Sequence, residues 1–190
     1  MNLFDFDNTI YKGESSFGYY FFCVKHHPKL IRFVFTVLFC LIKYKLCFIS
    51  EEGFMKLSQK YVHDFVEGCP DAEELAEKFW EKKFKKIKSF YFDMKHEDDV
   101  IISASFGFII RPAMNRLGIK NLVCSEVDFE TREIKHICFR KNKMQLFKEF
   151  FGDAKIKNFY TDSLNDIALL REAECGYIVK GKKIKKWSEK

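Results

Sequence analysis

The stretch "LFDFDNTI", residues 3–10, places two carboxylates, Asp5 and Asp7, at the end of an apolar run close to the first residue. A short apolar run of this kind is typical of a strand buried on both faces, as in a parallel sheet. In open parallel sheets the ligand lies beyond the carboxyl ends of the strands. We therefore expect both carboxylates to face a ligand site.

The composition is that of a globular protein. Of 190 residues, 47% are hydrophobic and 32% are charged, which excludes a disordered chain and a bundle of membrane helices. The length suits either one domain with a sizeable core or a compact domain that carries a modest insertion. The formal charge of +6 is mild and is concentrated in lysine-rich stretches around residues 82–88 and 180–190. This favours an anionic partner; we expect a small molecule and no nucleic acid.

The cysteines and histidines show no metal-binding spacing. Seven cysteines are scattered singly, without a CxxC pair, and the five histidines form no cluster in the sequence. An odd number of cysteines fits poorly with a secreted disulfide framework, so we predict buried thiols in a reducing compartment. The sequence does not open with a basic segment followed by a long apolar run. We therefore predict a cytoplasmic protein.

The most apolar stretch is "LIRFVFTVLFCLI", residues 30–42, followed by "KYKLCFI" up to residue 49. A spanning helix needs roughly 20 apolar residues, and Arg32, Lys43 and Lys45 limit the uninterrupted run to residues 33–42. The run is too short to cross a bilayer. Two interpretations stay open: a helix buried on most sides, or a helix that closes over an apolar substrate or lies on a membrane, giving a peripheral lipid contact.

The hydrophobic periodicity changes along the chain. From residue 15 to about residue 89 the pattern is almost entirely helical, whereas from Val100 onward short apolar runs alternate with amphipathic segments. This alternation predicts an α/β fold with a Rossmann-like parallel sheet. Because one strand precedes the helical stretch, we predict an all-helical insertion, residues 15–89, after the first strand of a core formed by residues 1–14 and 90–190.

Two further apolar runs end in polar side chains. Ser103 and Ser105 follow "DVII", and Asp162 and Asp166 follow "KNFY". If these strands lie beside the first, all of these groups meet at one edge of the sheet. Carboxylates packed together repel one another and need a hard cation, and carboxylate oxygens suit Mg²⁺.

Lys143 opens a predicted amphipathic helix, "KMQLFKEFFG". A cation is disfavoured there by the helix dipole. The position is better explained if Lys143 reaches a carboxylate or a phosphate.

Four motifs, in this order, resemble those of the haloacid dehalogenase (HAD) superfamily, and specifically its phosphoserine-phosphatase-like branch, subclass IB. "DFDNT" is similar to the DxDxT first motif, "IISAS" to the apolar run that ends in Ser or Thr, Lys143 to the third-motif lysine, and "TDSLND" to the acidic fourth motif. The resemblance covers nearly the whole chain. The predicted helical insertion lies where that branch carries its cap.

The resemblance implies a HAD-like phosphatase, a Mg²⁺-dependent phosphomonoester hydrolase that works through an aspartyl phosphate. Asp5 would be the nucleophile, and Asp7 the general acid and then the general base. The implied Mg²⁺ ligands are Asp5, Asp162 and the backbone carbonyl of Asp7. Lys143 would offset the negative charge of Asp5 and of the transferring group.

The resemblance also implies supporting roles. Ser103 and the backbone N–H of Ala104 would hold the phosphoryl group as helix N-termini do, with Ser105 an alternative by spacing. Asp166 would orient the metal's water ligands or Lys143, or it caps the helix that follows. For the lysine, Arg140 and Lys141 are alternatives in the same stretch. Asn8 stands where the family often has glycine, and asparagine tolerates a left-handed backbone.

The substrate is a small-molecule phosphate ester of undetermined class. Glu14 stands where phosphoserine phosphatases carry a glutamate for the substrate amine, but the only arginine of the predicted cap is Arg32, inside the apolar run. Phosphoserine is therefore not favoured. A phosphotransferase on the same intermediate, and a catalytically weak membrane-docking or interaction protein, are the alternative functions; the intact motif set argues against the second.

Overall fold

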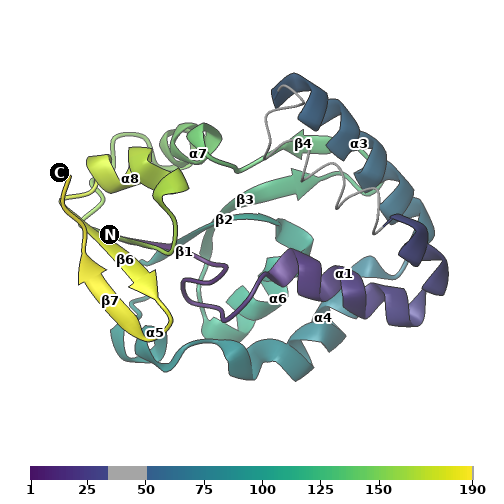
Figure 1. The fold of residues 1–190 in the computed structure, drawn as a ribbon, viewed down its shortest axis with the longest axis horizontal. Helices are drawn as coiled ribbons and strands as arrows, with labels where there is room; N and C mark the ends of the chain where they lie inside the picture. Colours follow the sequence, from purple (N-terminus) through teal and green to yellow (C-terminus); the bar gives the residue numbers. More distant parts are fainter. Residues whose placement is uncertain (34–50, 190) are drawn as a thin grey trace.

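A seven-stranded sheet forms the centre of the protein. The structure, a computed structural model, describes residues 1–33 and 51–189. The strand order is β4-β3-β2-β1-β5-β6-β7 (Figure 1). The strands are β1 (Asn2–Asp5), β2 (Val100–Phe106), β3 (Asn121–Val127), β4 (Ile134–His136), β5 (Asn158–Thr161), β6 (Cys175–Lys180) and β7 (Lys183–Lys186). The predicted α/β class with a Rossmann-like sheet is confirmed.

The sheet is mixed rather than wholly parallel. Strands β3, β2, β1, β5 and β6 pair in parallel, whereas the edge strands β4 and β7 pair antiparallel with their neighbours. Strand β7 lies within residues 180–190, a lysine-rich stretch for which the sequence analysis predicted no strand. Its Ile184 pairs with Val179 of β6, while Lys183, Lys185 and Lys186 are exposed. A lysine-rich edge strand blocks further strand addition.

Helices occupy the chain between β1 and β2 in the described residues. They are α1 (Ser15–His26), η1 (Pro28–Leu30), α3 (Glu51–Gly68), α4 (Ala72–Lys83), η2 (Phe84–Lys86) and α5 (Ser89–Met94). The later helices are α6 (Gly107–Leu117), α7 (Lys141–Phe151), η3 (Leu164–Asp166) and α8 (Ile167–Glu172). The assignment of residues 15–89 to a separate cap, and of the remainder to a core, stays a prediction.

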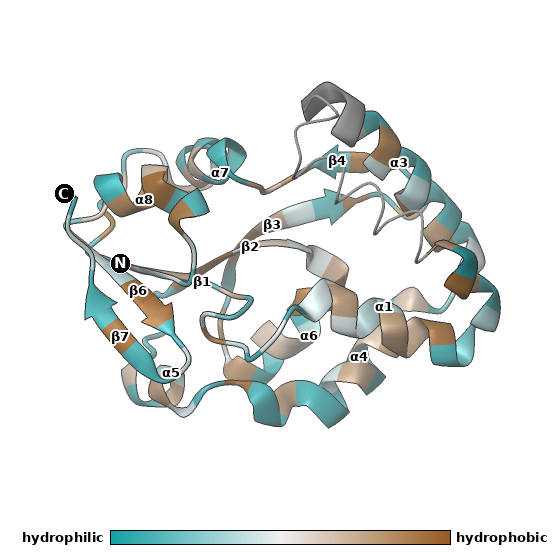
Figure 2. Cartoon of the chain, viewed as in Figure 1, coloured by the Kyte–Doolittle hydropathy of each residue, from teal (hydrophilic) through white to brown (hydrophobic). Residues whose placement is uncertain are grey.

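Two hydrophobic clusters cover the two faces of the sheet. One includes side chains of α1, α4 and α6, and the other includes side chains of α7 and α8. Figure 1 shows α7 and α8 on one side of the strands, with α4, α5 and α6 on the other. Figure 2 shows hydrophobic residues within β3 and β6 and hydrophilic ones on α7. The central strands are therefore covered on both sides, as their apolar runs predicted.

A buried aromatic seam joins α4 to the loop after β1 and to α6. The indole of Trp80 is fully buried and donates a hydrogen bond from Nε1 to the carbonyl of Ile109, at 2.5 Å. Its ring contacts those of Tyr11 and Phe6 edge-on, with centroid distances of 5.0 and 5.7 Å. One hydrophobic cluster thus includes residues on both sides of the predicted boundary at residue 89.

The apolar stretch at residues 30–42 lies mostly outside the described residues. Leu30 is buried, whereas Ile31 is 49% exposed. Residues 34–50 are not described, so both interpretations of the stretch stay predictions. No helix in residues 1–33 or 51–189 combines the length and the apolar character needed to cross a membrane.

Five of the seven cysteines lie in the described residues, and all five are free thiols. Four of them are buried, which agrees with the prediction for those four. Cys175 is only partly buried, and Cys40 and Cys47 lie outside the described part of the chain.

Candidate active site

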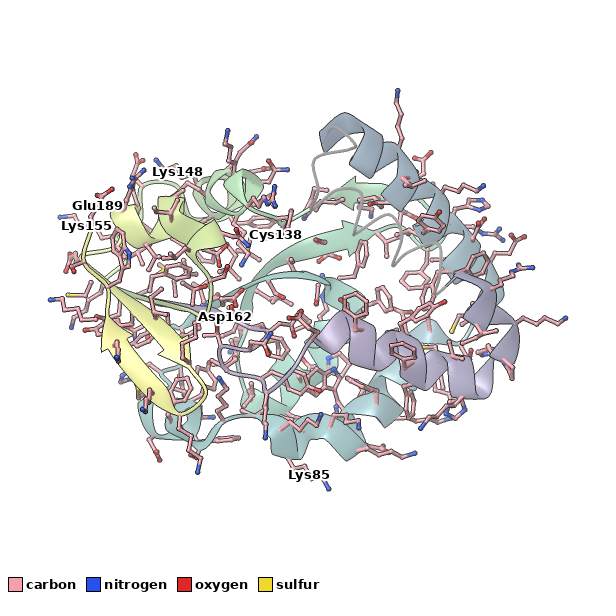
Figure 3. All side chains as sticks on the ribbon, viewed as in Figure 1. Lys85, Cys138, Lys148, Lys155, Asp162 and Glu189 are labelled. Carbon is pink, nitrogen blue, oxygen red and sulfur yellow. The ribbon has the colours of Figure 1, made fainter. Side chains whose placement is uncertain are left out.

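The predicted site lies at the carboxyl end of β1, the central strand. Asp5, its last residue, pairs with Ile102 of β2, and Phe4 pairs with Tyr160 of β5. Because the three strands are parallel, their carboxyl ends meet at one edge of the sheet. Figure 3 labels Asp162, just after β5, beside the loop that follows β1.

A pocket of about 210 Å³ opens at this edge. It contains every predicted site residue except Asn8. Its lining consists of Asp5, Asp7, Glu14, Ser103, Ala104, Phe139, Arg140, Lys143, Asp162, Ser163, Asn165 and Asp166.

Lys143 joins two carboxylates in the floor of the pocket. Its Nζ lies 2.7 Å from Oδ1 of Asp5 and 3.0 Å from Oδ2 of Asp166, and all three side chains are buried. Burial raises the pKa of Asp5 and Lys143 lowers it, which leaves the pKa at about 6. Helix α7 begins at Lys141, so Lys143 lies in its first turn, as predicted. The carboxylates outweigh the unfavourable helix dipole.

The sequence left three roles open for Asp166: a helix cap, a partner of Lys143, or a group that orients the water ligands of the metal. Its side chain makes no capping hydrogen bond to α8. Instead Oδ2 accepts hydrogen bonds from Lys143 and, at 2.9 Å, from Oγ1 of Thr161. Asp166 is therefore a second carboxylate partner of Lys143, beside Asp5.

The loop after β1 positions the second oxygen of Asp5. Buried Thr9 donates from Oγ1 to Oδ2 of Asp5 at 2.9 Å. Asn8 adopts a left-handed backbone with φ of 59°, as the sequence suggested. Its carbonyl accepts from Lys88, and its side-chain amide donates to Glu14. Asn8 therefore shapes the loop and Glu14 lies exposed at the rim.

Asp7 faces the start of α1. Its Oδ1 accepts from the backbone N–H of Ser15 at 2.7 Å, and its Oδ2 accepts from the hydroxyls of Ser15 and Ser105 at 2.9 and 2.8 Å. Burial raises the pKa of Asp7 to about 7, although these hydrogen bonds lower it. The group is thus poised to exchange a proton near neutral pH.

The two candidate serines of β2 have different surroundings. Ser105 is bound to Asp7 and to Ser16, whereas Ser103 lines the pocket and accepts from the backbone N–H of Ser105 at 3.2 Å. Ser103 lies inside β2, and α6 begins only at Gly107. The backbone N–H groups that follow Ser103 therefore belong to a strand and not to a helix N-terminus. Irregular pairing of β2 with β3 between Ile102 and Phe106 sets this segment's course instead.

The pocket carries more negative than positive groups. Its lining contains five carboxyl side chains and two cationic ones, Arg140 and Lys143. Burial raises the pKa of Asp162, and the nearby carboxylate of Asp166 raises it further against the opposing effect of Lys180. Crowded carboxylates with one buried lysine between them are the donor set that a divalent cation with oxygen ligands fits.

A family model described as haloacid dehalogenase-like hydrolase matches residues 3–171. The chain belongs to this HAD family. No match was found among curated proteins.

Three solved structures share the HAD fold of this chain. A protein of unknown function from Bordetella pertussis Tohama I aligns with a TM-score of 0.68 and 14% identity, over 90% of this chain and 85% of its own. A phosphoserine phosphohydrolase-like protein from Francisella tularensis aligns with a TM-score of 0.56 and 16% identity, over 93% of this chain and 86% of its own. A HAD family hydrolase from Salmonella enterica serovar Typhi aligns with a TM-score of 0.55 and 11% identity, over 90% of this chain and 59% of its own.

Sequence reasoning missed several lining residues of the HAD pocket. Arg140, the N-terminal flank of α7, entered only as an alternative to Lys143, and it lines the pocket beside that lysine with a positive φ of 50°. Phe139, Ser163 and Asn165 line it too. All of them lie within four residues of a predicted site residue, so adjacency was the available signal.

The histidines form no cluster in the sequence, but the tertiary structure brings one of them beside other candidate metal ligands. His27 lies near Cys69 and Asp71, and the ligand atoms of the three lie within 4.8 Å of one another. A second, exposed group consists of His63, Asp64 and Glu67 on α3.

Proposed function

We propose that the chain is a Mg²⁺-dependent phosphomonoester hydrolase in which Asp5 is the nucleophile. The observation that carries this proposal is the position of Asp5 in the pocket floor, held by hydrogen bonds from Lys143 and Thr9, with Asp7 two residues further on. Membership of the HAD-like hydrolases supports it. So does the fold shared with a phosphoserine phosphohydrolase-like protein.

The metal would be held by Asp5, Asp162 and the backbone carbonyl of Asp7. The excess of carboxyl groups in the pocket supports this choice of ligands. When bound, Mg²⁺ supplies positive charge that lets an anionic phosphate ester approach an anionic nucleophile.

The first half-reaction uses both early carboxyl groups. A carboxylate oxygen of Asp5 attacks phosphorus, and the bond from phosphorus to the ester oxygen breaks as the aspartyl phosphate forms. Asp7 donates its proton to the departing oxygen, giving the free alcohol. Its pKa of about 7 leaves a large protonated fraction at neutral pH, as a general acid requires.

The second half-reaction returns the enzyme to its starting state. Asp7, now a carboxylate, accepts a proton from water as the water oxygen attacks phosphorus. The bond from phosphorus to Asp5 breaks, which releases inorganic phosphate and leaves Asp7 protonated again. An acceptor alcohol in place of water would make the same chain a phosphotransferase.

Phosphoryl binding is assigned to groups on two sides of the pocket. The hydroxyl of Ser103 and the backbone N–H of Ala104 would contact the phosphoryl oxygens from β2. Lys143 would offset the charge on Asp5 and on the transferring group. Arg140 extends this cationic side, since it lines the same pocket.

Substrate choice is assigned to the helical segment, residues 15–89, acting as the cap. Helix α1 begins directly at the donors to Asp7, and Glu14 lies on the rim just before it. A segment that starts beside the catalytic carboxyls is suited to cover them and exclude water.

The proposal is tested by hydrolysis of a broad phosphate-ester panel with Mg²⁺. We expect turnover by the wild type and none above background by Asp5→Asn, because the amide keeps the shape but is not a nucleophile. Asp153→Asn, at an exposed site, is the matched control and should keep full activity. Glycerol as acceptor distinguishes transfer from hydrolysis. Full activity in Asp5→Asn, or no turnover of any ester together with tight vesicle binding, would overturn the proposal.

A further inference from the structure

A cluster of metal-ligating side chains lies at the far end of α1, away from the pocket that holds Asp5. His27 follows the last residue of α1, while Cys69 and Asp71 come from the turn between α3 and α4. Nothing in the HAD motifs involves these three residues. We propose that His27, Cys69 and Asp71 form a binding site for Zn²⁺.

Two of the three distances between ligand atoms suit a zinc ion after a small adjustment, and the third is no more than 4.8 Å. With bonds of about 2.0–2.3 Å, the ligand atoms of a tetrahedral site lie roughly 3.3–3.8 Å apart. The Sγ of Cys69 and Oδ1 of Asp71 are 3.8 Å apart. The Nε2 of His27 and the same Oδ1 are hydrogen-bonded at 2.5 Å and must separate by less than about 1 Å, within reach of side-chain rotation.

The side chain of Asp71 is turned away from its usual task. Asp71 occupies the N-cap position of α4, where an aspartate ordinarily accepts a hydrogen bond from the backbone of the first turn. Its side chain makes no such bond. It points instead at His27 and Cys69, which gathers three ligand types at one place.

The cluster has a buried sulfur and a solvent-facing mouth. Cys69 is fully buried, whereas the side chains of His27 and Asp71 are 29% and 38% exposed. The imidazole and the carboxylate are therefore accessible to an ion from the surface. Sulfur, imidazole and carboxylate together favour Zn²⁺ over Mg²⁺, since Mg²⁺ takes oxygen ligands.

Cys23 provides a neighbouring thiol one helical turn before His27. Its thiol shares a hydrogen bond with that of Cys69. Both cysteines are free and fully buried. Zinc binding would release the thiol proton of Cys69, and Cys23 would then donate its S–H to the bound sulfur as an outer partner.

Such a site would tie the end of α1 to the start of α4. Tyr19 of α1 already donates from its hydroxyl to the carbonyl of Ala72, at 2.5 Å. Figure 1 shows α1 and α4 as neighbours in this part of the molecule. The ion would therefore stabilise the helical segment and raise the midpoint of thermal unfolding.

The test uses the full chain, reduced and stripped of metal, in buffer with excess Mg²⁺ to compete at the carboxylate pocket. We expect one equivalent of Zn²⁺ to bind, and Co²⁺ in its place to give a thiolate-to-cobalt charge-transfer band. Cys69→Ser should abolish the band. His27→Gln and Asp71→Asn change partly exposed side chains, and both variants should keep the circular dichroism spectrum of the wild type. Each should weaken Zn²⁺ binding by at least roughly 10–100-fold, which is the loss that follows removal of an outer partner of a metal ligand.

Two controls separate this site from adventitious binding. His63→Gln changes the exposed histidine of the second cluster, and Cys175→Ser removes a cysteine remote from α1; both should leave affinity and band unchanged. Cobalt binding without a thiolate band, equal losses in His63→Gln, or unchanged affinity in both His27→Gln and Asp71→Asn would overturn the proposal. The experiment reads no phosphatase activity, so its result is independent of the proposed function.

Discussion

Replacing Lys143 by methionine tests the electrostatics of the pocket floor directly. Methionine is similar in length and carries no charge, so the change leaves Asp5 and Asp166 buried without their shared cation. The carboxylates are only 7% and 5% exposed, and Lys143 lies 2.7 and 3.0 Å from them. Removing one partner of a buried ion pair costs about 3–5 kcal/mol. For a chain of this size, that lowers the unfolding midpoint by about 6–20 °C.

The cost should depend on pH with a definite sign. Lys143 lowers the pKa of Asp5, which burial has raised, so its loss moves that pKa above the present value of about 6. The variant can then relieve the buried charge by binding a proton as the pH falls. The difference in unfolding free energy between wild type and variant should therefore be large at pH 8 and smaller at pH 5.

The assay is urea unfolding followed by circular dichroism, in EDTA, at pH 5 and pH 8. Lys141→Met is the matched control, because Lys141 is exposed and lies two residues earlier on the same helix. It should change stability by less than about 0.5 kcal/mol. A loss below about 1 kcal/mol for Lys143→Met at pH 8, or the same loss at both pH values, would refute this reasoning.

Three further predictions concern the same pocket. Phosphatase activity should vanish in EDTA and return with Mg²⁺, and full activity in the chelator would contradict the metal requirement. The Asp162→Ala variant should need a higher Mg²⁺ concentration for half-maximal activity, with an unchanged circular dichroism spectrum. In the folded protein the pKa of Asp7 is about 7, above its ordinary value of 3.8, so the contribution of this group to stability falls as the pH rises between those values. In metal-free urea unfolding, the Asp7→Asn variant should lack that decline. The same pH dependence of the unfolding free energy in both proteins would argue against this prediction. Ser105→Ala removes a hydrogen bond that lowers the pKa of Asp7, so the alkaline limb of the activity profile should move to higher pH, while an unmoved limb would show that Asp7 is not the acid.

The floor of the pocket was predictable because each of its residues carries a local signal. Asp5 ends an apolar run, and Lys143 lies in the first turn of a helix, where the helix dipole disfavours a cation. Each position therefore indicates a charged or ligand partner. The parallel sheet then decides where those partners lie. The role of Asp166 could not be narrowed further, because partnering the lysine, orienting the water ligands of the metal and capping the helix all fit the same sequence.

The contacts that sequence reasoning missed are tertiary. Ser15 gives no sign of its bond to Asp7, because any serine at a helix start suits a capping role. His27 and Cys69 are far apart in the sequence, so no spacing rule connects them. Strand β7 was missed for another reason. Three of its four residues are lysines, so the sequence shows little of the apolar pattern of a strand, and only the partly buried Ile184 packs against the hydrophobic cluster beside β6.

The aromatic seam around Trp80 has a consequence for chimeric proteins. Grafting residues 15–89 of a relative onto this sheet would replace Trp80, leaving the carbonyl of Ile109 without its donor and the rings of Tyr11 and Phe6 without their neighbour. A chimera should therefore place its junction after α3 and keep α4 together with the sheet of the same protein.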